Sequence, residues 1–416
     1  MTDDRAASRP SDGPPAQRCR PRDLGIVIGL MPTGPTNSIV DVPGVRVGHA
    51  TVWRDEPPVP TGRGIARTGV TAILPGDDRM LTSHPVLAGL AVLNGAGEVS
   101  GRTQIDEWGA FEGPIMLTST MAVGRVYDAV VQLLVSERAE TDPDHWMIPV
   151  VAECSDSHLN DARLVQIDVE DVRRALASAH GAEAGAPPSG AIGAGTGMVC
   201  HELKGGIGGA SRRVVPANDE APTLIAGEPG ASGDGAYTVG ALVLSNYGWL
   251  EQLIVDGVRV GPTLVAEGYA RRSGPDGLRP ESGSVIVVLA TDAPLDSRQL
   301  QRLARRAGMG MARTGGFAGS GSGDIFLAFS TAGRVPQGAG PLLEQSFLAD
   351  AYIDPFFVAA VEVTEEAAID SLVAGDTVAG RDGNVIHGLP IERVVELLRA
   401  AGRPAHLPTP LPSGRT

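Results

Sequence analysis

The sequence predicts an α/β or layered α+β fold, because two kinds of hydrophobic pattern alternate along the chain. Short apolar runs flanked by Gly and Pro are typical of buried strands, and apolar residues that recur every three to four positions are typical of helices. Strands and helices that are interleaved in this way favour stacked layers of sheet and helix. The predicted strands are Val70–Leu74, Ile115–Leu117, Met147–Val151, Val239–Leu244, Val285–Leu289 and Ile325–Phe329. The predicted helices are Pro85–Leu93, Val123–Ser136, Ser297–Met311, Phe347–Glu366 and Glu392–Ala400.

The domain organisation follows from length and composition. The chain has 416 residues, of which 42% are hydrophobic and 20% charged, as in ordinary globular proteins. This length allows two or three domains, but no linker-like stretch separates two self-sufficient patterns. A single large domain over residues 21–403 is therefore as plausible as several smaller ones, and it is the organisation that we expect; disordered tails are predicted at 1–20 and 404–416. Stretches rich in Gly, Pro and charge predict surface insertions at Gly181–Ser189, Asn218–Ala236 and Glu267–Ser282.

Charge and cysteine content restrict the partners and the compartment. The net charge is −15 and no basic cluster is present, which argues against nucleic acid and anionic membrane as partners. No apolar run approaches the ~20 residues of a membrane span. The N-terminal residues lack the apolar core of a secretory signal, and the three cysteines do not form a disulfide framework. These features predict a cytoplasmic protein.

The dipeptide Gly283-Ser284 is the most informative feature of the chain. A hydrophilic stretch rich in Pro and Gly leads directly into it, and the apolar strand Val285–Leu289 follows. Such a junction is usually only a turn, but it also suits a protein that cleaves itself. Cleavage would make Ser284 a new amino terminus, and its α-amine, with a pKa of about 7.7–8, could take the proton of the serine hydroxyl.

Polar residues at three other strand ends are candidates to act with Ser284. Ser322 and Asp324 precede the strand Ile325–Phe329, and a right-handed crossover between parallel strands would bring them to the same sheet edge as Ser284. Asn246 ends the strand Val239–Ser245; beside an antiparallel Ser284 strand, its amide could donate to an oxyanion. Each group also fits a simple turn. Glu153 closes a further strand, where its carboxylate could bind the amine of a substrate.

Several sequence blocks, in order over roughly residues 22–395, resemble the L-aminopeptidase/D-esterase family of self-processing serine peptidases, which includes DmpA-like enzymes and β-peptidyl aminopeptidases. The blocks include Asn37–His49, Arg67–Pro75, Leu93–Glu98, Glu112–Ile115, Gly195–Met198, Lys204–Gly208, Asn246–Gly248 and Gly321–Ile325. The resemblance implies a four-layer αββα sandwich of the DmpA and ornithine acetyltransferase type. It also implies autoproteolysis into residues 1–283 and 284–416, no cofactor, and homo-oligomers of cleaved heterodimers.

The resemblance further implies roles for the candidate residues. It makes Ser284 the nucleophile and gives Ser322 and Asp324 a triad-like network with it. Asn246 is implied to stabilise the oxyanion, and Glu153 to bind the amine of small peptides or of amino-acid amides and esters. The chain departs from the family at Ser155, where relatives commonly carry an aromatic residue, often tyrosine, whose hydroxyl helps the oxyanion site.

Other motifs favour structural roles. The Gly-rich stretches Gly190–Gly197 and Gly205–Gly209 lack the residues of a phosphate loop and are interpreted as tight turns. His158 and His201 lack the spacing of metal ligands, so we expect no metal site. The sequence thus predicts a self-cleaving serine aminopeptidase that uses an acyl-enzyme on Ser284. The alternatives are an acyltransferase of the related fold, which cuts before threonine, and an unprocessed inactive homologue with a binding or structural role.

Overall fold

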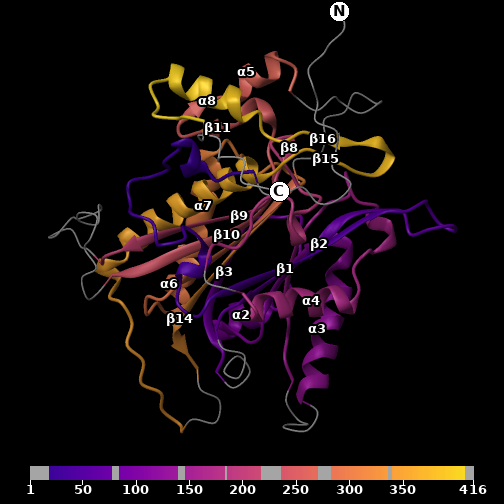
Figure 1. Cartoon of the computed structure of the whole chain (residues 1–416). Coiled ribbons are helices and arrows are strands. Elements are labelled where there is room, and N and C mark those ends of the chain that lie inside the picture. The colour runs from indigo at the N-terminus through magenta and orange to yellow at the C-terminus, as the bar shows by residue number, and fades with distance from the viewer. Residues whose placement is uncertain are drawn as a thin grey trace, which may run out of the picture.

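Two β-sheets packed face to face form the centre of the molecule, and helices cover both outer faces (Figure 1). The structure is a computed structural model that describes residues 18–76, 84–138, 146–182, 185–216, 236–269, 283–335 and 340–407. The six-stranded sheet has the order β4-β3-β14-β13-β10-β9, with β3 (Val86–Gly95), β4 (Ala110–Phe111), β9 (Gly206–Val214), β10 (Tyr237–Tyr247), β13 (Gly283–Thr291) and β14 (Gly323–Arg334). The four-stranded sheet has the order β1-β2-β5-β6, with β1 (Arg46–Asp55), β2 (Ile65–Leu74), β5 (Ile115–Ser119) and β6 (Val150–Cys154). The expected αββα sandwich is confirmed.

Strand β13 shows why the sheets pack on both faces. Successive side chains of a strand point to opposite faces, and this strand is apolar at almost every position. Val285 and Val287 pack toward the helices of the six-stranded sheet, whereas Ile286 and Val288 pack against the four-stranded sheet. The even-numbered positions of β13 therefore face the space between the sheets, and Ser284 shares that parity.

The outer layers are helices whose apolar faces cover the sheets. The helices α3 (Val123–Arg138) and α4 (Val169–His180) cover the four-stranded sheet, and α6 (Ser297–Arg313) and α7 (Asp354–Ala374) cover the six-stranded sheet. The Asp296 side chain accepts from Gln299 N and caps the amino terminus of α6.

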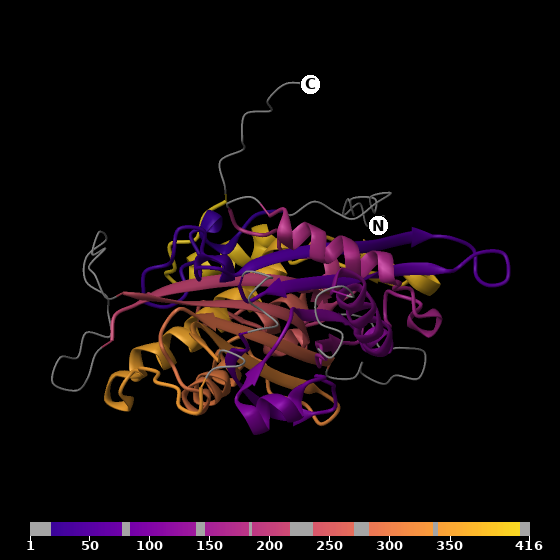
Figure 2. The same ribbon diagram turned by 90° about the horizontal axis from the view of Figure 1, so that it is seen from below.

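The other elements are short: α2 (Arg102–Trp108), α5 (Gly261–Ala266), α8 (Ile391–Ala400), β7 (Val199–Cys200), β8 (Leu203–Lys204), β11 (Ile254–Val255), β12 (Val258–Arg259), β15 (Val378–Ala379) and β16 (Val385–Ile386). The turn between β1 and β2 projects beyond the body of the molecule (Figure 2).

Two predicted elements are wrong because close packing overrides local pattern. The segment Pro85–Leu93 was expected to be a helix but forms β3, an inner strand buried on both faces along its first half. At Gly89 a Cβ atom would lie 2.2 Å from the Gln301 backbone nitrogen of α6, so glycine permits this close approach. Likewise, Gly205–Gly209 is not a tight turn, because residues 206–209 form the start of β9. A Cβ at Gly208 would lie 1.9 Å from the Ala367 carbonyl oxygen of α7.

Other predicted boundaries move because of proline. The predicted strand Met147–Val151 becomes β6, which begins immediately after Pro149. The predicted helix Phe347–Glu366 becomes α7, with Pro355 in its first turn. Proline is tolerated there because a backbone N–H in the first turn has no intrahelical partner. The elements β1, β9 and α4 were not predicted.

The chain ends and insertions are only partly described. Residues 1–17 and 408–416 of the expected tails, and 183–184, 218–235 and 270–282 of the expected insertions, lie outside the described residues. Arg20, placed in the N-terminal tail by the sequence, forms an ion pair with the buried Asp370 of α7 at 3.1 Å. At the other end, His406 N donates to Leu24 O at 2.8 Å. Among the described residues, no helix is long and apolar enough to cross a membrane.

Candidate active site

Ser284 lies at the start of β13, between two strands that carry the other candidate residues. Its pairing partner on the antiparallel strand β10 is Asn246, and its partner on the parallel strand β14 is Gly323. Its side chain is buried, with 7% of the residue exposed. Both strand pairings on which the sequence argument depended are present, and the strand starts of β13 and β14 meet the end of β10 at one edge of the sheet.

Gly283 has a backbone conformation that excludes other residues. Its φ is +71°, in the left-handed region that favours glycine. A Cβ atom at this position would lie only 1.7 Å from the Asn246 carbonyl oxygen. The residue before the candidate nucleophile therefore has to be glycine for the strand to start here, and its carbonyl carbon has no side chain beside it.

The Asn246 amide is held on both sides. Its Oδ1 accepts from Val199 N at 2.8 Å, and its Nδ2 donates to Ser155 O at 3.0 Å. A primary amide has two N–H donors, and the bond to Ser155 O uses one of them. The sequence identified Asn246 but not the two backbone groups that orient it, because such contacts join segments far apart in the chain.

Ser322 and Asp324 form a buried pair beside the start of β13. The Ser322 hydroxyl donates to Asp324 Oδ1 at 2.7 Å, while Asp324 Oδ2 has no hydrogen-bond partner among the described residues. Burial raises the pKa of Asp324 to about 6, and the Ser322 hydrogen bond opposes this shift. Asp324 pairs with Val285, so strand alternation places its side chain on the helix-facing side, beside the backbone rather than the hydroxyl of Ser284.

Glu153 lies in β6 of the opposite sheet and its carboxylate is close to β14. A Cβ at Gly97 would lie 3.1 Å from Glu153 Oε1 and 3.2 Å from the Cα of Gly323, the pairing partner of Ser284. Glu153 Oε1 accepts from Glu98 N at 3.0 Å, and its Oε2 accepts from the Thr120 hydroxyl. Burial raises the pKa of Glu153, and these two hydrogen bonds lower it. The structure thus brings Glu153 to the same site as Ser284.

The neighbouring residues Cys154 and Ser155 differ in burial: Cys154 is buried between the sheets, and Ser155 is exposed. The Cys154 thiol donates from its Sγ to Leu244 O at 3.7 Å. Burial raises its pKa well above the usual value, and a hydrogen bond with the Ser284 hydroxyl opposes the shift. Ser155 is exposed and its hydroxyl donates to Ser157 Oγ at 3.0 Å. At this departure from the family pattern, it is the Ser155 main-chain carbonyl that contacts the site, through Asn246.

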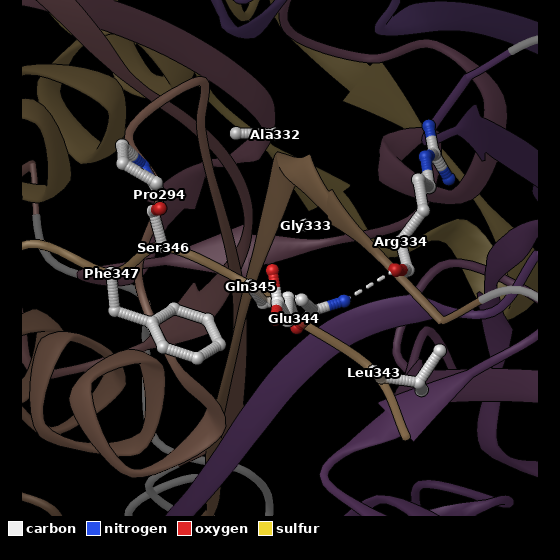
Figure 3. A pocket seen from close by; sticks show the side chains of 9 residues that line it. All are labelled: Pro294, Ala332, Gly333, Arg334, Leu343, Glu344, Gln345, Ser346 and Phe347. Atoms are coloured by element: carbon white, nitrogen blue, oxygen red, sulfur yellow. Dashed lines mark hydrogen bonds between the residues drawn. The ribbon is translucent and has the colours of Figure 1, made fainter. Parts of the chain in front are cut away.

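Other features lie apart from these residues. A pocket of about 360 Å³ opens between Pro294, beyond the end of β13, and Arg334, the last residue of β14 (Figure 3). Ser284 and Gly323 stand at the starts of the same strands, so this pocket is at the opposite end of the sheet. His201 is buried and its Nδ1 contacts Trp249 O at 3.1 Å. No group of three or more His, Cys, Asp or Glu side chains with the geometry of a metal site occurs in the described part of the chain.

The chain is similar over most of its length to known peptidases. The model of peptidase family S58 matches residues 37–386. The beta-peptidyl aminopeptidase BapA of Sphingosinicella microcystinivorans is 39% identical over 402 residues, which are 95% of this chain and 94% of the relative. Among solved structures, the l-aminopeptidase d-ala-esterase/amidase of Ochrobactrum anthropi, a variant of the Ntn hydrolase fold, is 38% identical with a TM-score of 0.81 and covers 93% of this chain and 99% of its own. A beta-aminopeptidase from Burkholderia sp. is 40% identical with a TM-score of 0.78. The match covers 92% of this chain and 99% of the Burkholderia chain. The chain therefore belongs to peptidase family S58, a family of peptide-hydrolysing enzymes.

Proposed function

We propose that the chain is a serine aminopeptidase that activates itself by cutting the Gly283–Ser284 bond. The observation that carries this proposal is the conformation of Gly283, which only glycine can adopt here, directly before a buried serine that is paired with Asn246. A turn that merely led into a strand would not need an unshielded carbonyl beside an oriented amide and a hydroxyl.

Self-cleavage would proceed by transfer of the Gly283 acyl group from nitrogen to oxygen. The Ser284 Oγ attacks the Gly283 carbonyl carbon, and the Asn246 N–H stabilises the oxyanion that forms. The C–N bond then breaks, the Ser284 nitrogen takes the proton and becomes an α-amine, and an ester remains on Oγ. Water hydrolyses this ester, which leaves a carboxylate on Gly283 and restores the hydroxyl.

The processed enzyme would use the same groups on substrates. The α-amine of Ser284 takes the proton of its own hydroxyl as Oγ attacks a substrate carbonyl, and returns a proton to the leaving amine. Asp324, whose Oδ2 has no hydrogen-bond partner among the described residues, accepts a hydrogen bond from that amine, and Ser322 orients Asp324. The acyl-enzyme on Ser284 is then released by water.

Glu153 would make the enzyme an aminopeptidase. A buried carboxylate near Gly323 is placed to pair with the free amine of a substrate, which fixes the scissile bond one residue from the amino terminus. The names of the relatives, beta-peptidyl aminopeptidase and l-aminopeptidase d-ala-esterase/amidase, support short peptides, amides and esters with a free amine as the substrate class.

The two fragments would remain together after cleavage. Fragment 284–416 supplies β13 and β14, which lie between β3 and β10 of fragment 1–283 in the six-stranded sheet. Separation would therefore break the sheet through its centre. We propose that these cleaved heterodimers assemble into homo-oligomers in the cytoplasm, in accord with three cysteines that are all free thiols.

The proposal is tested by comparing wild type with Ser284→Ala, Ser284→Cys and, as a matched control, Ser320→Ala. Ser320 is an exposed serine in the loop before β14. Self-cleavage on a denaturing gel and hydrolysis of an amino-acid p-nitroanilide should both be lost in Ser284→Ala and retained in Ser320→Ala. Ser284→Cys should still cut, since a thiolate is a strong nucleophile. Cleavage of Ser284→Ala at the same bond would show that an outside protease makes the cut.

A further inference from the structure

Lys204 is a buried lysine that forms no ion pair with a carboxylate among the described residues. It is the only lysine in a sequence in which Lys and Arg together number 34, and it is fully buried. Burial lowers the pKa of Lys204 to about 7, so holding a charge here costs free energy. An apolar side chain of similar length would fill the space without that cost.

The Lys204 ammonium gathers three backbone carbonyls. Its Nζ donates to Gly195 O at 3.0 Å, to Met198 O at 2.7 Å and to Gly205 O at 2.7 Å. An ammonium has three N–H donors, so these bonds use all of them. The planar guanidinium of arginine has a different donor geometry and cannot replace a point charge at the centre of three acceptors.

The carbonyls belong to the turn that orients the candidate oxyanion donor. Gly195 and Met198 delimit the turn that leads into β7, and the next residue, Val199, donates its N–H to Asn246 Oδ1 at 2.8 Å. The same turn packs against the segment that fixes the other side of the amide. A Cβ at Gly197 would lie 2.7 Å from the Cβ of Asp156, which follows Ser155.

We infer that Lys204 is a positioning residue of the active site: by fixing the turn from Gly195 to Val199, it aims the Asn246 amide at the oxyanion formed on the acyl carbon attacked by Ser284. This inference deepens the proposed function and rests on it. Lys204 touches neither substrate nor nucleophile, and its effect passes through Val199 N and Asn246 Oδ1. It acts in both self-cleavage and substrate hydrolysis, because the same amide serves both.

The test removes the ammonium and asks whether the loss passes through Asn246. In folded, processed Lys204→Met and Lys204→Gln, kcat for an amino-acid p-nitroanilide should fall by about 10- to 100-fold, the size expected when a catalytic group is misplaced by about 1 Å. KM should change little, because the turn does not bind the substrate. Self-cleavage should slow in parallel. Arg212→Met, which removes another fully buried cation that contacts α7, should lower stability but leave kcat of the folded enzyme near the wild-type value.

A double-mutant cycle separates positioning from a general structural effect. If Lys204 acts through Asn246, adding Lys204→Met to Asn246→Ala should lower kcat by less than about threefold more, because the two residues act on one route. Wild-type kcat in the Lys204 variants, or losses that multiply in the double variant, would overturn the inference.

Two further variants test the role of Lys204 if its own substitutions prevent folding or if the proposed function fails. If the Lys204 variants do not fold, Val199→Pro deletes the N–H that reaches Asn246 and leaves Lys204 in place. The kcat of Val199→Pro should fall, and adding this substitution to Asn246→Ala should cause no further loss. A wild-type kcat in Val199→Pro would show that Lys204 does not act through Val199 N and Asn246 Oδ1. Ser284→Ala separates a failure of the proposed function from a failure of the role of Lys204. Cleavage or activity in Ser284→Ala refutes the proposed function, whereas an inert Ser284→Ala beside a fully active Lys204→Met refutes only the role of Lys204.

Discussion

Asn246 and Ser284 are paired residues on the neighbouring antiparallel strands β10 and β13, with both side chains on the face toward the four-stranded sheet. Directly opposed residues of an antiparallel pair have Cβ atoms about 4.5–5.5 Å apart. The strand register alone therefore fixes an amide beside a hydroxyl, and Val199 N–H and Ser155 C=O fix how that amide is turned.

Asn246→Ala should lower kcat on an amino-acid p-nitroanilide by about 100- to 1,000-fold, the effect of removing one oxyanion donor. Asn246→Asp is the matched variant: it keeps an oxygen that can accept from Val199 N but loses the N–H donors, so it should be impaired as well. Steady-state kinetics on fully processed protein checks both. A wild-type kcat in processed Asn246→Ala would remove this residue from the mechanism.

Gly283→Ala should abolish self-cleavage, because its Cβ would lie 1.7 Å from the Asn246 carbonyl oxygen and would displace the start of β13. Gly268→Ala is the control: Gly268 also has a positive φ, +86°, but no atom lies within 4 Å of its Cβ position. A denaturing gel after expression measures the outcome. Normal cutting in Gly283→Ala would mean that the described conformation is not the one that reacts.

Glu153→Gln should impair hydrolysis of substrates with a free amino terminus and spare any hydrolysis of their N-acetylated analogues. The reason is that the neutral amide cannot pair with an ammonium group. The loss should appear in KM if the pair only binds, and in kcat/KM if it positions the scissile bond. Equal losses on both substrate types would show that Glu153 does not recognise the amine. In a companion variant, Ser155→Tyr, increased activity would indicate that the natural site lacks a hydroxyl donor.

Self-cleavage should accelerate as the pH rises through about 6, the pKa to which burial raises Asp324. Above that pH the carboxylate is charged and can accept a hydrogen bond from the Ser284 nitrogen as bond cleavage turns that nitrogen into an amine. Below that pH the acid is neutral and accepts more weakly. In the processed enzyme the nearby Ser284 ammonium should lower the pKa of Asp324, so the acidic limb of hydrolysis should lie at lower pH. Cutting rates of freshly synthesised chain, measured against pH, check this. Asp324→Asn should slow cutting and remove the limb, whereas a wild-type rate independent of pH would contradict the role of Asp324.

The strand ends that carry the candidate residues could be predicted from the sequence, because polar residues there interrupt otherwise apolar strands. This signal located Ser284, Asn246, Glu153 and Asp324. The segment that became β3 could not be predicted, since its Leu and Ala residues favour a helix locally and only the close approach of α6 at Gly89 reveals a strand. Lys204 carries a signal that could have been used: a single lysine in a sequence otherwise supplied with arginine. Its role could not be derived, because three converging carbonyls are visible only in three dimensions.

The most direct test of the account is amine labelling of the denatured protein, read by mass spectrometry. Fragment 284–416 contains no lysine, so the one amine that it can offer is the α-amine at its own start. We predict that active wild type consists of fragments 1–283 and 284–416, with the label of the second fragment on Ser284. Ser284→Ala should be one chain, labelled at its amino terminus and at Lys204. An active wild-type protein that remains one chain, or whose second fragment begins at another residue, would contradict the claim that Ser284 is a self-generated N-terminal nucleophile.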